Sequence, residues 1–202
     1  MSGVPLLVEA NGLRVLVVGG GEVAARKART FCDAGATVRV VSPAAGDDIL
    51  ELARAGKIVL TSRVFVAGDV GDAELVIAAT SDRATNAAVA TESRAVRCLV
   101  NVSDAPEEGH FVTMATHRSG ELVIGVSAGG VPDAAKRIRD AIGKRFDDRY
   151  AHALAELATL RRRLLDRRER HRWHEVASDV CGAGFCEAVE SETIDEKVSP
   201  WR

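Results

Sequence analysis

A glycine-rich turn directly after a short apolar run is the feature that most constrains the fold of this chain. Residues 13–18, LRVLVV, are mostly apolar and β-branched, and three glycines follow at 19–21. Residues 22–35, EVAARKARTFCDAG, carry apolar and small side chains at helical spacing, with Gly35 suited to end a helix. The sequence therefore predicts a strand, a tight glycine turn and a helix, which is how dinucleotide-binding α/β domains begin.

The glycine turn has the spacing Gly19-x-Gly21-x-x-Ala24. The first glycine permits the tight turn, the second lets a pyrophosphate approach the backbone, and the small third residue lets helix and strand pack closely. The amides of Glu22 and Val23 would lie at the helix N-terminus, where the dipole favours an anion. A purely structural glycine turn is the alternative, but the placement between strand and helix favours cofactor binding by these five residues.

The acidic residue that usually holds the ribose of NAD is missing. The predicted second strand, ATVRVVSP, ends at Pro43, and Asp47 and Asp48 come too late in the chain. Arg39 lies in the middle of that strand and is an uncertain partner for a phosphate. The sequence by itself therefore does not choose between NAD and NADP, and backbone contacts at Pro43 and Ala44 could hold the adenosine side.

Strands and helices continue to alternate up to about residue 104. Further strands are predicted at 58–64, 75–80 and 97–102, with helices at 47–57 and 83–95. Continuous apolar strands of this kind are buried on both faces of a parallel sheet. Thr80 follows the fourth strand and could contact a nicotinamide or substrate. The alternative for this region is helix capping by Ser81 or Asp82.

The pattern changes after this point. Residues 111–128 indicate two strands joined at Ser119-Gly120, and a helix follows from Pro132 to Phe146. A long helix is predicted from about 149 to 177, and the acidic segment from Cys181 onward is expected to be loosely ordered.

Composition narrows the function classes. The chain has 202 residues, 47% of them hydrophobic, and a net charge of −2, which argues against a nucleic-acid-binding protein. No apolar run approaches the ~20 residues of a membrane span. The N-terminus lacks the basic region of a signal peptide, and four cysteines do not make a disulfide scaffold. We expect a cytoplasmic protein that binds neither nucleic acid nor membrane.

The stretch NVSDAP contains the candidate acid Asp104. An Asp two residues before Pro106 is common turn chemistry, which is the ordinary interpretation. However, the predicted fifth strand ends at Val102, so Asp104 would lie at the carboxyl edge of the sheet. The glycine turn lies at the same edge, where ligands of such sheets bind.

The order of LRVLVVGGGEVAARKA, LVIAATSD, NVSDAP and ELVIGVSAGG, followed by an Arg-rich helical tail, resembles the precorrin-2 dehydrogenase and sirohydrochlorin ferrochelatase family. That family also forms the N-terminal module of sirohaem synthase. The resemblance, over about residues 3–175, implies NAD-dependent dehydrogenation of precorrin-2 to sirohydrochlorin, with possible insertion of ferrous ion into the same macrocycle. It also implies that Asp104 is the catalytic residue and that the protein is a homodimer.

The predicted fold class is thus α/β in three parts. An NAD-binding Rossmann-like domain spans 1–112, a dimerisation segment of hairpin and helix spans 113–147, and a helical C-terminal domain spans 148–202. The hairpin fits a role between subunits because a two-stranded sheet by itself is marginally stable.

The implied tetrapyrrole substrate carries eight carboxylates, so cationic partners are needed. Candidate cations are Arg118, Lys136, Arg137 and Arg139, for which simple solvation is the alternative. Asn101, Ser127, Gly129 and Gly130 complete the expected substrate-binding set.

The remaining chemically active side chains have ordinary interpretations. His110 and His117 are more typical of exposed loop histidines than of proton donors. Cys181 and Cys186 are poorly spaced for zinc, so no resident metal is expected. The rival function is a regulatory module that senses NAD without chemistry, which would leave Asp104 and the glycines at 129–130 unexplained.

Overall fold

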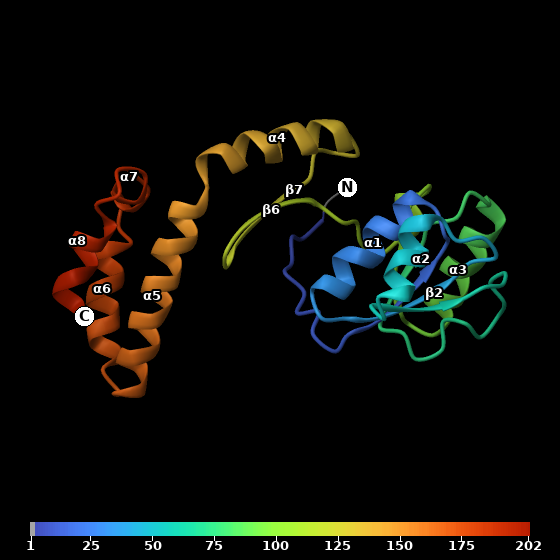
Figure 1. The fold of residues 1–202 in the computed structure, drawn as a ribbon, viewed down its shortest axis with the longest axis horizontal. Coiled ribbons are helices and arrows are strands. Elements are labelled where there is room, and N and C mark those ends of the chain that lie inside the picture. Colours follow the sequence, from blue (N-terminus) through green and yellow to red (C-terminus); the bar gives the residue numbers. More distant parts are fainter. Residues whose placement is uncertain (1–2) are drawn as a thin grey trace. The chain divides into compact units, whose positions relative to one another are not determined.

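The computed structural model describes residues 3–202, which divide into two compact units (Figure 1). The first unit extends to Thr113 and contains a five-stranded sheet, and the second begins at Met114 and contains a hairpin and helices. The predicted Rossmann-like domain, hairpin-and-helix segment and helical C-terminal region are all present, which confirms the fold class.

The first unit alternates strands and helices as predicted. Its elements are β1 (Arg14–Val18), α1 (Glu22–Asp33), β2 (Thr37–Val41), α2 (Asp47–Arg54), β3 (Ile58–Thr61), β4 (Leu75–Ala78), α3 (Arg83–Ala95), β5 (Leu99–Val102) and a 3-10 turn, η1 (Pro106–Glu108). The strands are parallel in the order β3-β2-β1-β4-β5. The order reverses between β1 and β4, and ligands of open α/β sheets bind at the carboxyl side of such a switch point.

Alternating strand residues build two cores, one on each face of the sheet. Val15 and Val17 of β1 pack with buried residues of α1 and α2 on one face. Leu16 and Val18 pack with α3 on the other. Successive strand residues point to opposite faces, so an unbroken apolar strand is required when both faces are covered. Ala24, which is fully buried, lets α1 approach the sheet closely.

The start of α3 is fixed by Asp82, one of the two predicted caps. Its carboxylate accepts hydrogen bonds from the amides of Ala84 (3.2 Å) and Thr85 (3.0 Å). A bond from the Thr85 hydroxyl, followed by these two amide bonds, holds the pKa of Asp82 below its usual range because all three stabilise the charged form. The cap thus sets where the chain turns from β4 into α3.

The connection from β3 to β4 is held by side-chain bonds. Asp69 is buried and pairs with both terminal nitrogens of Arg63 at 2.6 Å. Arg39, the uncertain phosphate partner, donates instead to the carbonyl of Asp69 at 3.1 Å and lies 3.9 Å from the Asp72 carboxylate. Both partners precede β4, at the amino edge of the sheet. Arg39 therefore serves the fold at the edge opposite the glycine turn.

The second unit begins with an antiparallel pair, β6 (Ala115–Ser119) and β7 (Leu122–Val126). Its helices are α4 (Pro132–Arg145), α5 (Asp148–Asp166), α6 (Arg170–Val180), α7 (Phe185–Glu190) and α8 (Ile194–Val198), with a final 3-10 turn, η2 (Ser199–Trp201). No helix within residues 3–202 combines the length and the apolar character that crossing a bilayer requires.

The long helix predicted over 149–177 is wrong in one respect, because it breaks between α5 and α6. Arg168 has a left-handed backbone, with φ 60°. Its amide donates to the carbonyl of Leu165 (2.9 Å), and the amide of Glu169 donates to that of Leu164 (2.8 Å). These two bonds form a Schellman motif, which ends a helix and is usually built on glycine. The sequence shows arginine there, so the break was not predicted.

The segment after Cys181 was expected to be loosely ordered, but it folds into α7 and α8. Four of its apolar side chains are buried against α5 and α6, namely Ala188, Val189, Ile194 and Val198. The acidic residues Glu192, Asp195 and Glu196 of this segment are exposed, so a charged composition conceals a helical apolar face.

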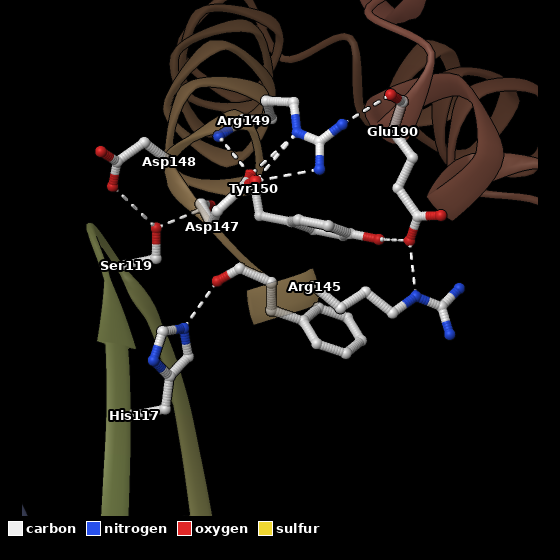
Figure 2. Close-up of polar contacts among 9 residues, drawn as sticks. His117, Ser119, Arg145, Asp147, Asp148, Arg149, Tyr150 and Glu190 are labelled. Carbon is white, nitrogen blue, oxygen red and sulfur yellow. Dashed lines mark hydrogen bonds and ion pairs between the residues drawn. The ribbon is translucent and has the colours of Figure 1, made fainter. Parts of the chain in front are cut away.

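Polar contacts join α7 and the hairpin to the α4–α5 junction (Figure 2). The Glu190 carboxylate of α7 accepts from Arg145 (2.6 Å) and from the Tyr150 hydroxyl (2.7 Å). Burial, followed by the bond to Glu190, raises the pKa of Tyr150. On the hairpin, His117 Nε2 lies 2.6 Å from the carbonyl of Phe146, at the C-terminal end of α4. His117 is therefore a half-buried structural residue.

A buried ammonium links α1 to β5 in the first unit. Lys27 is 8% exposed and donates to Asn101 Oδ1 and to Ser103 Oγ, the latter at 3.0 Å. Both acceptors are neutral. Burial, with a smaller contribution from the nearby Arg26, lowers the pKa of Lys27 from 10.5 to about 8.

This arrangement predicts a pH dependence of stability. Between about pH 8 and pH 10.5 the unfolded chain binds more protons at Lys27 than the folded chain does, so the free energy of unfolding should rise with pH. A shift of this size corresponds to a gain on the order of 3 kcal/mol for this residue. Urea unfolding of the wild type and of Lys27→Met at pH 7 and pH 10 measures it, because the variant should lack the rise.

Lys57→Met is the matched control. Its ammonium is exposed and its hydrogen bond to Asp33 (2.8 Å) raises the pKa above 10.5, so removing it should leave the rise intact. Equal pH dependence in the wild type and in Lys27→Met would contradict a buried charged lysine.

Candidate active site

The glycine turn at 19–21 follows β1 at the switch point of the sheet. Gly19 has φ +132°, and a Cβ there would lie 2.3 Å from the carbonyl oxygen of Ala79. A Cβ on Gly20 would lie 2.0 Å from the carbonyl oxygen of Ala44. Both contacts are with backbone that cannot move aside, so only glycine fits at these two positions.

Gly21 differs, because a Cβ there would meet no atom within 4 Å. Its backbone is extended, with φ −85°, so packing and conformation both tolerate a side chain. Gly21 is the N-cap of α1 and has no side chain to cap the helix, which begins with the exposed residues Glu22 and Val23. Open space, uncapped amides and the positive end of a helix dipole together fit the pyrophosphate of a dinucleotide.

The end of β2 lies against this turn. Ser42 Oγ donates to the carbonyl of Ala44 (2.7 Å), and the amide of Gly46 donates to the carbonyl of Gly20 (2.9 Å). Pro43 and Ala44 are exposed at this edge, in the position expected for the adenosine half of the cofactor. Their cofactor contacts remain predictions.

Thr80 is engaged locally at the end of β4. Its hydroxyl donates to the carbonyl of Asp82 (2.9 Å) or to Asn86 Oδ1 (2.8 Å), and its amide donates to the same Asn86 oxygen (3.1 Å). Asn86 is fully buried. These bonds shape the entry to α3, and a further contact of Thr80 with a nicotinamide or substrate stays a prediction.

Asp104 lies in the bend after β5, at the same carboxyl edge as the glycine turn. The amide of Ser103 donates to the carbonyl of Ala78 (2.9 Å), which extends the pairing of β5 with β4 up to the bend. The Asp104 side chain is 37% exposed, and Arg83 Nε of α3 lies 3.9 Å from its carboxylate. Asp104 is therefore both a bend residue and an accessible carboxylate beside a cation.

Two neighbours of Asp104 have structural roles. Asn101 is buried, accepts from Lys27 and donates to the carbonyl of Phe111 at 2.9 Å. A further contact of Asn101 with a substrate stays a prediction. His110 Nδ1 accepts from the amide of Val100 (3.2 Å), and the His110 amide donates to the Val100 carbonyl (2.7 Å). Both residues fix the segment that carries Asp104.

The remaining substrate candidates belong to the second unit. Gly129 and Gly130 have φ of 58° and 88° and form an exposed turn before α4. Arg118, Ser127 and Lys136 are also exposed. Their roles stay predictions.

Arg83 and Lys27 were not predicted from the sequence. Arg83 is the first residue of α3, and this position after the fourth strand marks it as a side chain of the carboxyl edge. Lys27 has no such signal, because a lysine on a helix is normally solvated.

Within the described residues, no three His, Cys, Asp or Glu side chains are arranged to hold a metal ion. Cys181 is exposed and Cys186 is half-buried, and both are free thiols.

A family model described as "Putative NAD(P)-binding" matches residues 6–115, which is the first unit and the start of β6. The match includes the glycine turn, the end of β2 and the bend with Asp104. The dinucleotide that the uncapped helix indicates is thus of the class, NAD(P), for which the family is described.

Two sequence relatives are sirohaem synthases. The chain is 39% identical over 205 residues to "Siroheme synthase" of Methylococcus capsulatus, covering 96% of this chain and 43% of that protein. It is 39% identical over 199 residues to "Siroheme synthase" of Pseudomonas putida strain W619, covering 98% and 41%. The chain therefore spans less than half the length of these curated relatives.

A solved structure, "SirC, precorrin-2 dehydrogenase", has the same fold, with a TM-score of 0.78, 24% identity and coverage of 98% of each chain. The chain belongs to the NAD(P)-binding family that matches its first unit, and its identity to sirohaem synthases confirms the family resemblance predicted from the glycine turn and the NVSDAP motif.

Proposed function

We propose that this chain catalyses the NAD-dependent dehydrogenation of precorrin-2 to sirohydrochlorin, a step of sirohaem biosynthesis. The observation that carries the proposal is the shared edge of the first unit. An uncapped helix start at Gly21 and an accessible carboxylate at Asp104 lie at the carboxyl ends of strands in one sheet. The names of the similar proteins supply the substrate class.

Each part of the edge has a task in this reaction. NAD, when bound, would supply the acceptor for the hydride that leaves the macrocycle. The amides of Glu22 and Val23 bind the pyrophosphate, and the exposed Pro43–Ala44 backbone borders the adenosine half. The Asp104 carboxylate accepts the proton that leaves the macrocycle, as a general base. Lys27 holds the segment before Asp104 against α1, through Asn101 and Ser103.

We further propose ferrochelation at the same carboxylate. Inserting Fe²⁺ into sirohydrochlorin releases two pyrrole protons, and Asp104 can receive protons in turn. Support comes from relatives named for the synthesis of sirohaem.

The proposed assembly is a cytoplasmic homodimer with the hairpin at its interface. Leu122, Val123, Ile124 and Val126 of β7 are only half-buried within one chain, which leaves apolar surface for a second copy. The free thiols of this chain suit a reducing compartment.

Gly21→Ala tests the cofactor site. A Cβ at Gly21 meets no protein atom, so the thermal midpoint should stay within a few degrees, given a cost of about 1 kcal/mol or less for alanine at an N-cap. The methyl group would occupy the space of the pyrophosphate, so the Kd for NAD, measured by calorimetry, should rise at least about tenfold, or ~1.4 kcal/mol. Unchanged affinity in a folded variant would exclude this turn as the pyrophosphate site.

Asp104→Asn tests the chemistry. The variant keeps the shape of the side chain and loses its basicity, so kcat for precorrin-2 oxidation should fall about 10²-fold or more while NAD still binds. The macrocycle's absorbance follows the reaction. A wild type that binds NAD without converting precorrin-2 would instead favour the NAD-sensing module.

Ferrochelation is measured separately, by adding Fe²⁺ to sirohydrochlorin without NAD. If one carboxylate serves both reactions, the Asp104→Asn variant should insert Fe²⁺ more slowly than the wild type does. A variant that chelates at the wild-type rate would restrict Asp104 to the oxidation.

A further inference from the structure

Arg83 occupies an unusual position for a surface arginine. Its Nε lies 3.9 Å from Asp104, and its terminal nitrogen pairs with Glu108 of η1. The guanidinium thus lies between the proposed catalytic carboxylate and a second acid. Both acids raise the pKa of Arg83, Glu108 more strongly, so the cation is permanent.

The carboxylate partner of Arg83 is held in place by backbone contacts. Arg94 of α3 donates to the carbonyl of Glu108, and the Glu108 amide donates to the carbonyl of Ala105 at 2.9 Å. Glu108 is therefore presented to Arg83 by η1, the turn that follows the bend with Asp104. The neighbouring Glu107 lies close enough to act on Arg83 electrostatically and makes no ion pair with it among the described residues.

The Arg83–Glu108 pair is accessible and exchangeable. The side chains of Arg83 and Glu108 are 48% and 34% exposed. Exposed ion pairs of this kind contribute little net stability, so another carboxylate can replace Glu108 at little cost. A planar guanidinium can bind an incoming carboxylate through two parallel hydrogen bonds.

We infer that Arg83 binds a peripheral carboxylate of the substrate beside Asp104, and that Glu108 occupies this subsite in the free protein. The inference rests on the proposed function, which supplies a polycarboxylate macrocycle as substrate. A carboxylate held at Arg83 lies next to Asp104 and so fixes one rim of the macrocycle against the base. Glu108 acts as an internal competitor, which gives the two residues opposite effects on substrate affinity.

The test combines kinetics with direct binding. With NAD saturating, Arg83→Ala should raise KM for precorrin-2 about tenfold while kcat changes less than about threefold, and Arg83→Lys should recover part of the loss. Glu108→Gln should lower KM about threefold, because the competing charge is gone. The Kd for NAD should be the same in all variants.

Matched controls separate this subsite from a general charge effect. Glu107→Gln removes the same charge from the same turn without breaking the ion pair, and should leave KM unchanged. Arg54→Ala removes an exposed cation from the last turn of α2 and should do the same. Raising NaCl from about 50 to 500 mM should reduce the difference between wild type and Arg83→Ala, because exposed charges are screened.

Uroporphyrin III, a stable octacarboxylate porphyrin, provides a readout that does not require turnover. Its Kd, followed by fluorescence, should rise in Arg83→Ala and fall in Glu108→Gln. The two variants could shift the Kd of this probe as expected while the wild type does not oxidise precorrin-2. In that case the proposed function fails and the subsite stands. An unchanged KM and Kd in Arg83→Ala would overturn the subsite. A loss of affinity in Glu108→Gln, or a parallel change in NAD binding, would do so as well.

Discussion

The first unit depends on a close approach of backbone segments at the glycine turn. Gly19 lies so near the carbonyl of Ala79, and Gly20 so near that of Ala44, that any side chain at either position would overlap backbone. These contacts hold the ends of β1, β2 and β4 together where the chain turns from β1 into α1, whose start is uncapped. A single steric constraint therefore both closes the fold and creates the anion-binding end of the helix.

The direction of the strands decides which side chains gather at the carboxyl edge of the sheet. Because all five strands are parallel, every loop that directly follows a strand leaves the sheet at the same edge as the glycine turn. Asp104 and Arg83 follow two neighbouring strands, β5 and β4, which accounts for their proximity. At the opposite edge Asp72 pairs with Arg39 of β2 and with Arg14 of β1, which ties the connection between β3 and β4 to the sheet.

Periodicity and turn chemistry were enough to predict most elements, the glycine turn and the edge position of Asp104. Glycine as the signal for the end of a helix failed where another residue type adopts the left-handed conformation. Arg168 adopts the left-handed conformation that usually requires glycine, and Arg97 and Glu192 do so at the ends of α3 and α7. Lys27 was missed because its burial follows from the packing of α1 on the sheet, which no local pattern encodes.

The two cations near Asp104, Lys27 and Arg83, differ in burial, which gives the first a structural role and the second a role in the proposed substrate binding. Lys27 is buried, and its ammonium has already lost its hydration. Losing its partners would leave a buried charge without hydrogen bonds, so its bonds to Asn101 and Ser103 are fixed. Arg83 keeps about half of its surface in water and holds Glu108 with little net energy. Only the second cation can release one carboxylate and accept another on the timescale of binding. The bend with Asp104 is thus anchored on its inner side by a permanent contact and bordered on its outer side by an exchangeable one.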